Sequence, residues 1–337
     1  MIFFFLLLCM SVISSVFVSF SKDSGVCLCA KVITFFILLL PLAFQYGVGV
    51  DYFNYTNIFN AIAHGRNLYE DEAGWLYLNR LVFRLGGNAQ MIFAVTDALI
   101  LYFLFSEVSR KKWFVYVPVC VAVIYPWLFT TLRQMLAMSM VFCGVLKFQK
   151  KKYIRACALM LGSYFFHKSV LVYIPLYFIV SVLKMKPRFA AVLLFCLCAV
   201  SYFFAGRLNA IFFAVIGISP KYALYLTTDW VNDTQAGMSR FARYIAYPAM
   251  LWFYPWGGVS TKLLTALFCF CAIDVCALEI QIVNRIGRGM LTIFMPIMYK
   301  VCVRKRLTLR LVVYVLGLFF MAYLRYATLQ YVSVFSR

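Results

Sequence analysis

Five arginines stand at the starts of apolar stretches, where a guanidinium would meet a membrane surface. Arg133 lies in TTLRQMLAMSM, and two further pairs of arginines lie within SRFARY and NRIGRG. Each pair is spaced for one helix face, and a guanidinium binds phosphate oxygens through two parallel hydrogen bonds. Arg133 taken alone would equally snorkel toward headgroups. Together they predict a site for a lipid with a diphosphate headgroup, formed by Arg133, Arg240, Arg243, Arg285 and Arg288.

Few residues of this sequence could act as a general acid or base, so the candidates for proton transfer are few. His167 is one of two histidines and lies between two short apolar segments in SYFFHKSVLVYIPLY. A histidine near neutral pKa can take or give a proton, although a packing role stays open. Asp51 follows a Gly-rich turn in GVGVDYF, and Glu72 ends the acidic run EDEAGW. Paired carboxylates serve glycosyl chemistry, but this run also fits a solvated surface.

Other carboxylates fall inside apolar stretches, where they are costly and normally face a partner or a cavity. We expect Asp97 and Asp274 to pair with arginines of other spans. Phosphate loops, nucleophile elbows and zinc motifs are missing from the sequence, and the C-x-C cysteines fit small hydrophobic roles. We therefore predict neither a metal nor a cofactor.

The composition indicates a polytopic membrane protein. Hydrophobic residues make up 65% of the 337 positions, and the mean hydropathy is +0.90, far above a soluble globule. The net charge of +21 comes from basic residues in short clusters between apolar runs. That distribution is typical of membrane loops, so nucleic-acid binding is not expected.

Cutting the chain at charged clusters predicts a single all-α transmembrane domain over residues 1–337, with about twelve (10–12) membrane helices. Several stretches are short enough to be re-entrant. The expected spans are 2–20, 32–48, 89–106, 113–130, 132–148, 153–166, 169–183, 189–206, 241–256, 263–283, 289–299 and 311–328.

Alternate loops are short and rich in Lys and Arg, which indicates the cytoplasmic side. Both termini and two longer loops, 49–88 and 207–240, then lie outside. In the first loop, Tyr52, Tyr55 and Ile58 recur at helical spacing with asparagines between them. This pattern predicts a helix lying on the membrane surface, with its polar face toward the outer compartment.

The order of five motifs along the chain resembles that of a known protein family. The segments GVGVDYFNYTNIF, EAGWLYLNRLVFRLGG, LRQMLAMSM, KFQKKKYIRA and YFFHKSVLVYIPLY follow one another. Their order resembles the EpsG-like branch of bacterial O-antigen and exopolysaccharide polymerases of the Wzy type. The likeness covers about residues 45–180 well and about 240–300 loosely. Gln45 stands where the family often has an arginine, which is a departure at that position.

The resemblance implies a GT-C-like glycosyltransferase of the bacterial inner membrane. It would join undecaprenyl-diphosphate-linked repeat units on the periplasmic face, without a metal. A chain-length regulator protein and a flippase are the implied partners, besides the bilayer itself.

The resemblance also assigns roles. The five arginines would hold the diphosphate, with Arg133 also catalytic, and His167 or Asp51 would be the base at the acceptor hydroxyl. The sugar would be held by Tyr52, Tyr55, Glu72, Trp75 and Gln134. Two rival functions remain: an O-antigen ligase-like transferase, and a flippase or other transporter of lipid-linked oligosaccharide.

Overall fold

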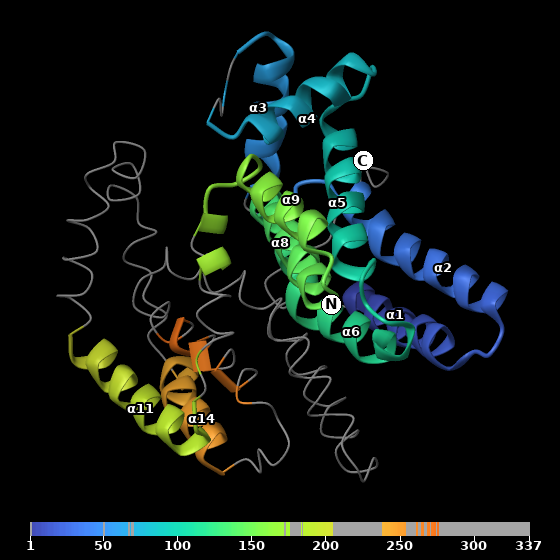
Figure 1. Cartoon of the computed structure of the whole chain (residues 1–337). Coiled ribbons are helices and arrows are strands. Elements are labelled where there is room, and N and C mark those ends of the chain that lie inside the picture. The colour runs from blue at the N-terminus through green and yellow to red at the C-terminus, as the bar shows by residue number, and fades with distance from the viewer. Residues whose placement is uncertain are drawn as a thin grey trace. The chain divides into compact units, whose positions relative to one another are not determined.

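The computed structural model describes residues 2–49, 51–66, 68, 71–171, 173–175, 183, 185–204, 238–253, 261, 264–265, 268–269, 271–273 and 275. Regular secondary structure within these ranges is helical (Figure 1). The chain divides into two compact units, Met1–Ile174 with Met298–Arg337, and Pro175–Ile297. The following paragraphs describe each unit by itself.

The first unit begins with two packed apolar helices. Helix α1 covers Ile2–Phe20 and α2 covers Ser24–Ala43. The Asp23 carboxylate caps α2, accepting a hydrogen bond of 2.9 Å from the Val26 amide, so the turn between the helices is fixed at a helix N-terminus. Both helices are long and apolar enough to cross a membrane.

A bent pair follows further along. Helix α5 (Ala89–Phe105) is capped by the Asn88 side chain, and the next helical stretch begins at Arg110, turned by 102°. If this pair counts as one span, the described residues hold three membrane-crossing candidates. The predicted total of about twelve is therefore not confirmed.

The predicted span 113–130 forms as three joined helical pieces. These are α6 (Trp113–Val119), the π-helical turn η2 (Cys120–Ile124) and α7 (Tyr125–Leu128). The Tyr125 hydroxyl donates a 2.7 Å hydrogen bond to the Leu38 carbonyl of α2. This bond ties the third of these pieces to the first helical hairpin.

Helix α8 (Leu132–Gln149) is the centre of the first unit. It lies between α5 and α9 (Tyr153–Tyr164), and most of its side chains are buried, including Ser139 and Gln134. A helix buried on most sides has no need of a polar face. The short turn between α8 and α9 makes the two helices run antiparallel, so the start of α8 and the end of α9 lie at one end of the unit.

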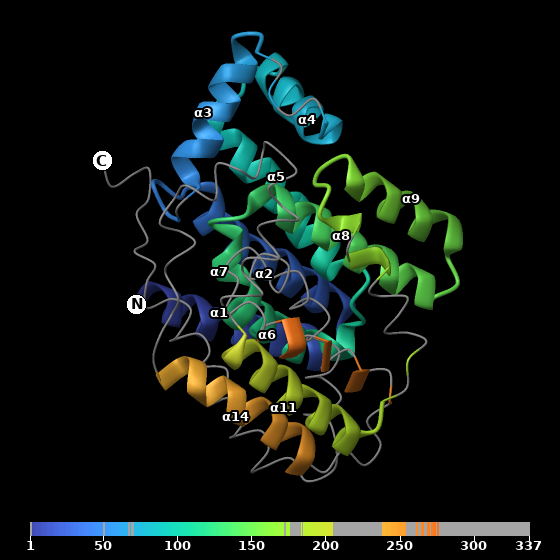
Figure 2. The same cartoon turned by 90° about the vertical axis from the view of Figure 1, so that its left-hand side faces the viewer.

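The predicted loop 49–88 contains a helical hairpin of α3 (Tyr52–Ala63) and α4 (Ala73–Arg84). Figures 1 and 2 both show these helices together at one end of the first unit. The predicted helix in this loop is confirmed. Its apolar face packs within the chain, near α4 and α5, and consists of Tyr52, Tyr55, Ile58, Phe59 and Ile62.

The second unit is described through two packed helices, α11 (Pro187–Phe203) and α14 (Met238–Phe253). Both correspond to predicted spans, at 189–206 and 241–256. The predicted loop 207–240 lies outside the described residues except for its last three, which begin α14.

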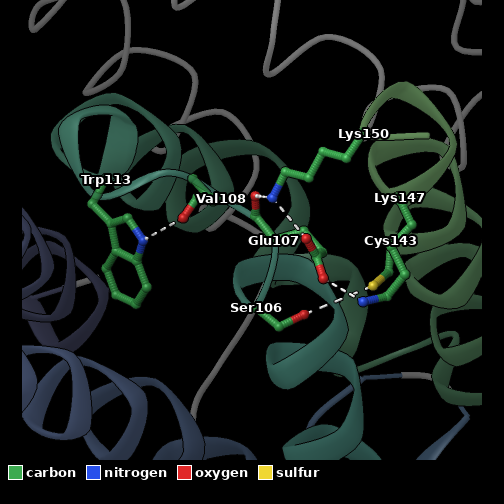
Figure 3. Close-up of polar contacts among 7 residues, drawn as sticks. All are labelled: Ser106, Glu107, Val108, Trp113, Cys143, Lys147 and Lys150. Carbon is green, nitrogen blue, oxygen red and sulfur yellow. Dashed lines mark hydrogen bonds and ion pairs between the residues drawn. The ribbon is translucent and has the colours of Figure 1, made fainter. Parts of the chain in front are cut away.

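A cluster of charges joins the end of α5 to the end of α8 (Figure 3). The Glu107 carboxylate bonds Lys147, and its other oxygen lies 2.7 Å from the Lys150 Nζ. Hydrogen bonds from the two lysines lower the pKa of Glu107 to about 2. Because the folded chain favours the ionised form, this cluster stabilises it above the ordinary pKa, and the contribution is lost as the pH falls from about 4.5 toward 2.

The cluster makes a prediction about stability. Lys147→Gln should lower the free energy of unfolding by about 1–2 kcal/mol at pH 7, because Glu107 loses a charged donor. Lys111→Gln is the matched control, since Lys111 is exposed, and it should change stability by less than about 0.5 kcal/mol. Thermal unfolding in detergent measures both. Equal melting temperatures for the two variants would mean that the cluster does not stabilise the fold.

Candidate functional site

The centre of the site is one buried carboxylate that an arginine and a histidine side chain contact. Glu72 is 2% exposed. One of its oxygens bonds Arg133 Nη1, and the other lies 2.9 Å from His167 Nδ1. A buried carboxylate is tolerated when it is paired and hydrogen-bonded in this way.

Three separate segments supply these side chains. Glu72 directly precedes α4, Arg133 is the second residue of α8, and His167 lies in the turn after α9. The antiparallel course of α8 and α9 brings Arg133 and His167 to the same end of the unit, where the α3–α4 hairpin meets them. Sequence analysis selected all three residues, but not their contact.

Gly74 allows the hairpin to approach the turn after α9. Its amide donates a 2.8 Å hydrogen bond to the Phe165 carbonyl. A Cβ placed on Gly74 would lie 3.0 Å from that carbonyl oxygen, which leaves too little room for a side chain. The glycine therefore brings Glu72 within reach of His167.

A second ion pair lies beside the first. Lys168 Nζ is 2.8 Å from Asp71 Oδ2, and both side chains are more than 40% exposed. The Asp71 carboxylate raises the pKa of Lys168. Consecutive residues of one segment thus pair with consecutive residues of another, but the exposed pair contributes little energy because water screens it.

Aromatic rings cover Arg133 from the hairpin side. Its guanidinium carbon lies 6.0 Å from the centre of the Tyr55 ring, a cation–π geometry. Tyr55 meets Trp75 edge-on, with ring centres 5.8 Å apart. Burial raises the pKa of Tyr55, and the neighbouring Arg133 charge opposes that rise. The Tyr55 hydroxyl is therefore neutral at ordinary pH.

The predicted sugar-binding residues Tyr52 and Gln134 are also buried. The Tyr52 hydroxyl donates to Gln90 Oε1 at 3.0 Å, and Gln134 Nε2 donates to the Tyr173 hydroxyl at 3.3 Å. Tyr52 also stacks on Phe93 at a ring separation of 5.0 Å. The Tyr52 contacts join α3 to α5, and the Gln134 contact joins α8 to Tyr173, beyond the end of α9.

The residues Gln45 and Asp51 lie next to this site. Gln45 is fully buried, and its backbone carbonyl accepts a 3.0 Å hydrogen bond from Gln90. Gly49, at φ +77°, has its Cα against the Phe129 carbonyl, since an added Cβ would lie 2.4 Å from that oxygen. Asp51 directly precedes α3, one turn before Tyr55, and its charge acts on the Tyr55 hydroxyl.

The remaining predicted arginines are not in the first unit. Arg240 and Arg243 belong to α14 of the second unit, and Arg285 and Arg288 lie outside the described residues. Their share in binding a diphosphate stays a prediction.

Sequence analysis missed the central position of Glu72, which it assigned to sugar binding, and gave Asn79 no role. The only available signal for Asn79 was an amide on a helix face shared with Glu72 and Trp75. Asp97 is fully buried, and neither carboxylate oxygen has a hydrogen-bond partner within the described ranges. Its expected arginine partner is therefore not found among those residues.

Comparison with known proteins gives one match. The model of the EpsG family matches residues 28–335. No curated protein matches the chain, and no solved structure does.

The ion pairs of Glu72 and of Asp71 should contribute differently to stability. Glu72→Gln should lower the free energy of unfolding by about 3 kcal/mol, because it leaves a mostly buried guanidinium without its carboxylate. Asp71→Asn is the adjacent control and should cost less than about 1 kcal/mol.

A double variant sharpens the measurement. The double variant Glu72→Gln/Arg133→Gln should lose about 1–3 kcal/mol less unfolding free energy than the sum of the two single losses. Each single change already removes the contact. Thermal unfolding of the four proteins gives the coupling. Additive losses would show that the pair does not act as one unit.

Proposed function

The chain belongs to the EpsG family, the family of Wzy-like polymerases and exopolysaccharide biosynthesis proteins, and from this premise we propose that it is a polysaccharide polymerase. The proposed reaction joins undecaprenyl-diphosphate-linked repeat units on the periplasmic face of the bacterial inner membrane. The observation that carries the proposal is the buried Glu72 carboxylate with His167 and Arg133 bonded to it. That arrangement combines a base with a phosphate-binding cation.

The proposed architecture is a GT-C-like domain of about twelve membrane helices spanning residues 1–337. Loops 49–88 and 207–240 would face the periplasm. The apolar hairpin of α1 and α2 supports a membrane protein, and the basic residues of the short loops support the orientation. On this topology, Glu72, Arg133 and His167 lie at the periplasmic end of the first unit.

Glycosyl transfer needs a base for the acceptor hydroxyl. The hydroxyl oxygen forms a bond to the anomeric carbon of the donor sugar, and the bond from that carbon to the lipid diphosphate breaks. His167 would take the hydroxyl proton at Nε2, because Nδ1 faces Glu72. The Glu72 carboxylate fixes the tautomer with the proton on Nδ1 and stabilises the imidazolium that forms.

Asp51 was the other candidate base. It is half-buried at the start of α3, and its charge acts on Tyr55. His167 is favoured because the Glu72 carboxylate orients its imidazole through Nδ1, so that Nε2 is the atom that would take the acceptor proton. Asp51 is then assigned to acceptor binding.

The leaving diphosphate needs positive charge and hydrogen-bond donors. A guanidinium carries five N–H groups in a planar arrangement, and Tyr55 supports the Arg133 guanidinium from one side. Arg133 would therefore present a fixed donor fork to the phosphates. Further charge would come from Arg240, Arg243, Arg285 and Arg288.

Sugar rings would be bound by the residues around this centre: Tyr52, Tyr55, Glu72, Trp75 and Gln134. The proposed partners are the lipid-linked repeat units, the bilayer, a chain-length regulator protein and a flippase. The chemistry as drawn needs no metal or cofactor.

The rival functions are a flippase and an O-antigen ligase-like transferase. One glycan assay, in a polymerase-null host that carries this gene, separates both from a polymerase. A flippase defect would leave repeat units inside the cell, and a ligase defect would leave long chains that stay on their carrier lipid. A polymerase defect displays single repeat units outside.

Arg133→Ala should leave the surface glycan capped with single repeat units, because the departing diphosphate loses its donor fork. Gel separation of the glycan shows this directly. Arg80→Ala, on α4 of loop 49–88, is the control for loss of an arginine and should give the long-chain ladder. A normal ladder with Arg133→Ala would remove Arg133 from the reaction.

His167→Ala should slow polymerisation by about 10²–10⁴-fold, the usual loss of a general base. The rate of chain growth in membranes measures it. Lys168→Ala, next in sequence and about half exposed, should keep a rate within about threefold of the original. Near-normal growth by the His167 variant would make this histidine a packing residue.

A further inference from the structure

Helix α4 turns a row of polar and aromatic side chains inward. Glu72, Trp75 and Asn79 follow one another at helical spacing on one face, and each is at most 2% exposed. Leu76 and Val82 are buried as well, so the inward side is mixed. The outward side exposes large apolar side chains, with Leu81 53% and the C-cap Leu85 71% exposed, together with Arg84. A helix with exposed apolar side chains and a buried amide suits a position that meets lipid outward and a polar site inward.

Two atoms in this row are buried and have no hydrogen-bond partner in the described part of the chain. They are the donor Trp75 Nε1 and the acceptor Asn79 Oδ1. The Asn79 amide group is held by its other end, since Nδ2 donates a 2.8 Å bond to the Trp75 carbonyl. A buried polar atom without a hydrogen-bond partner costs roughly 1–3 kcal/mol of stability. Two such atoms on one helix face therefore need a physical explanation.

The row adjoins the ionic centre. The Trp75 ring meets the Tyr55 ring, which lies beneath the Arg133 guanidinium. The Trp75 amide donates to the carbonyl of Glu72, 2.9 Å away. The Trp75 ring is therefore linked to the Arg133 guanidinium through one intervening ring, and Asn79 follows Trp75 one helical turn further along α4.

We propose that Trp75 Nε1 and Asn79 Oδ1 form a sugar subsite that binds hydroxyl groups of one repeat-unit sugar. This rests on the proposed polymerase function. A sugar hydroxyl donates and accepts at once, so neighbouring hydroxyls satisfy an N–H donor and a carbonyl acceptor together. The acceptor Asn79 Oδ1 cannot bond a phosphate oxygen, which is itself an acceptor, so the pair favours a hydroxyl group over the diphosphate. The subsite selects sugars by hydroxyl position.

The variants follow from the orphaned atoms. Trp75→Phe removes the N–H and keeps an aromatic ring, and Asn79→Leu removes the amide and keeps a branched side chain. Tyr77→Phe is the control, because Tyr77 is 70% exposed on the opposite face of α4. Asn79→Leu removes the unsatisfied Oδ1 and also the Nδ2 bond to the Trp75 carbonyl. These two effects on stability oppose each other, so the melting temperature should change little. This separates a binding loss from unfolding.

The first measurement uses a probe without phosphate. The probe is the repeat-unit oligosaccharide of the host glycan, released from its lipid by mild acid and added to purified full-length protein in nanodiscs. It should raise the melting temperature of the original protein and of Tyr77→Phe, and leave Trp75→Phe and Asn79→Leu unchanged. Equal shifts in all four proteins, or none in the original, would overturn the subsite.

The second measurement is chain growth on lipid-linked units. Trp75→Phe and Asn79→Leu should raise KM about tenfold or more, because a site built to hydrogen-bond a hydroxyl loses its partner. If Asn79→Leu instead lowers the melting temperature and leaves KM unchanged, the pair has a structural or water-binding role, and the subsite is wrong.

The two hypotheses fail differently. If the original protein polymerises and both variants match its KM, the subsite falls and the polymerase function stands. If the original protein does not polymerise, the function falls, and the subsite falls with it as a polymerase site even where the oligosaccharide binds.

Discussion

The buried carboxylate of Glu72 is the contact on which the site depends. It bonds Arg133 at the start of α8 and His167 after α9, so three segments distant in sequence meet at one group. A carboxylate 2% exposed would be costly without these partners. The ion pairs therefore depend on two further features, the close approach at Gly74 and the position of the α3–α4 hairpin. Together these three features hold the carboxylate in place.

One group thus serves both the fold and the proposed chemistry. Stability favours full pairing of every buried polar atom, and Glu72 meets that demand. Trp75 Nε1 and Asn79 Oδ1, one turn along the same helix, do not meet it in the described chain. Natural proteins break local rules of this kind at functional sites. The contrast along this segment separates Glu72, which organises the site, from Trp75 and Asn79, which are proposed to bind a sugar.

The sequence predicted the helices better than the site. Apolar runs marked α1, α5 and α8 to within a residue or so of their ends, because burial follows hydrophobic periodicity, and the 3.6-residue pattern found α3. The contacts of Glu72 join residues 61 and 95 positions apart, and no local pattern encodes such a meeting. Helix α4 was not predicted, since its buried side mixes the amide of Asn79 with apolar side chains while other large apolar side chains are exposed.

The charge of the centre constrains how a diphosphate leaves. Arg133 and Glu72 cancel, so Arg133 offers directed hydrogen bonds rather than net attraction. With neutral His167 the three groups sum to zero, and when His167 takes the acceptor proton they sum to plus one. That positive charge arises as the departing diphosphate gains its negative charge, so stabilisation grows toward the transition state and not in the resting complex. In the proposed reaction, attraction of the resting lipid diphosphate would then need other cations, the role proposed for Arg240, Arg243, Arg285 and Arg288.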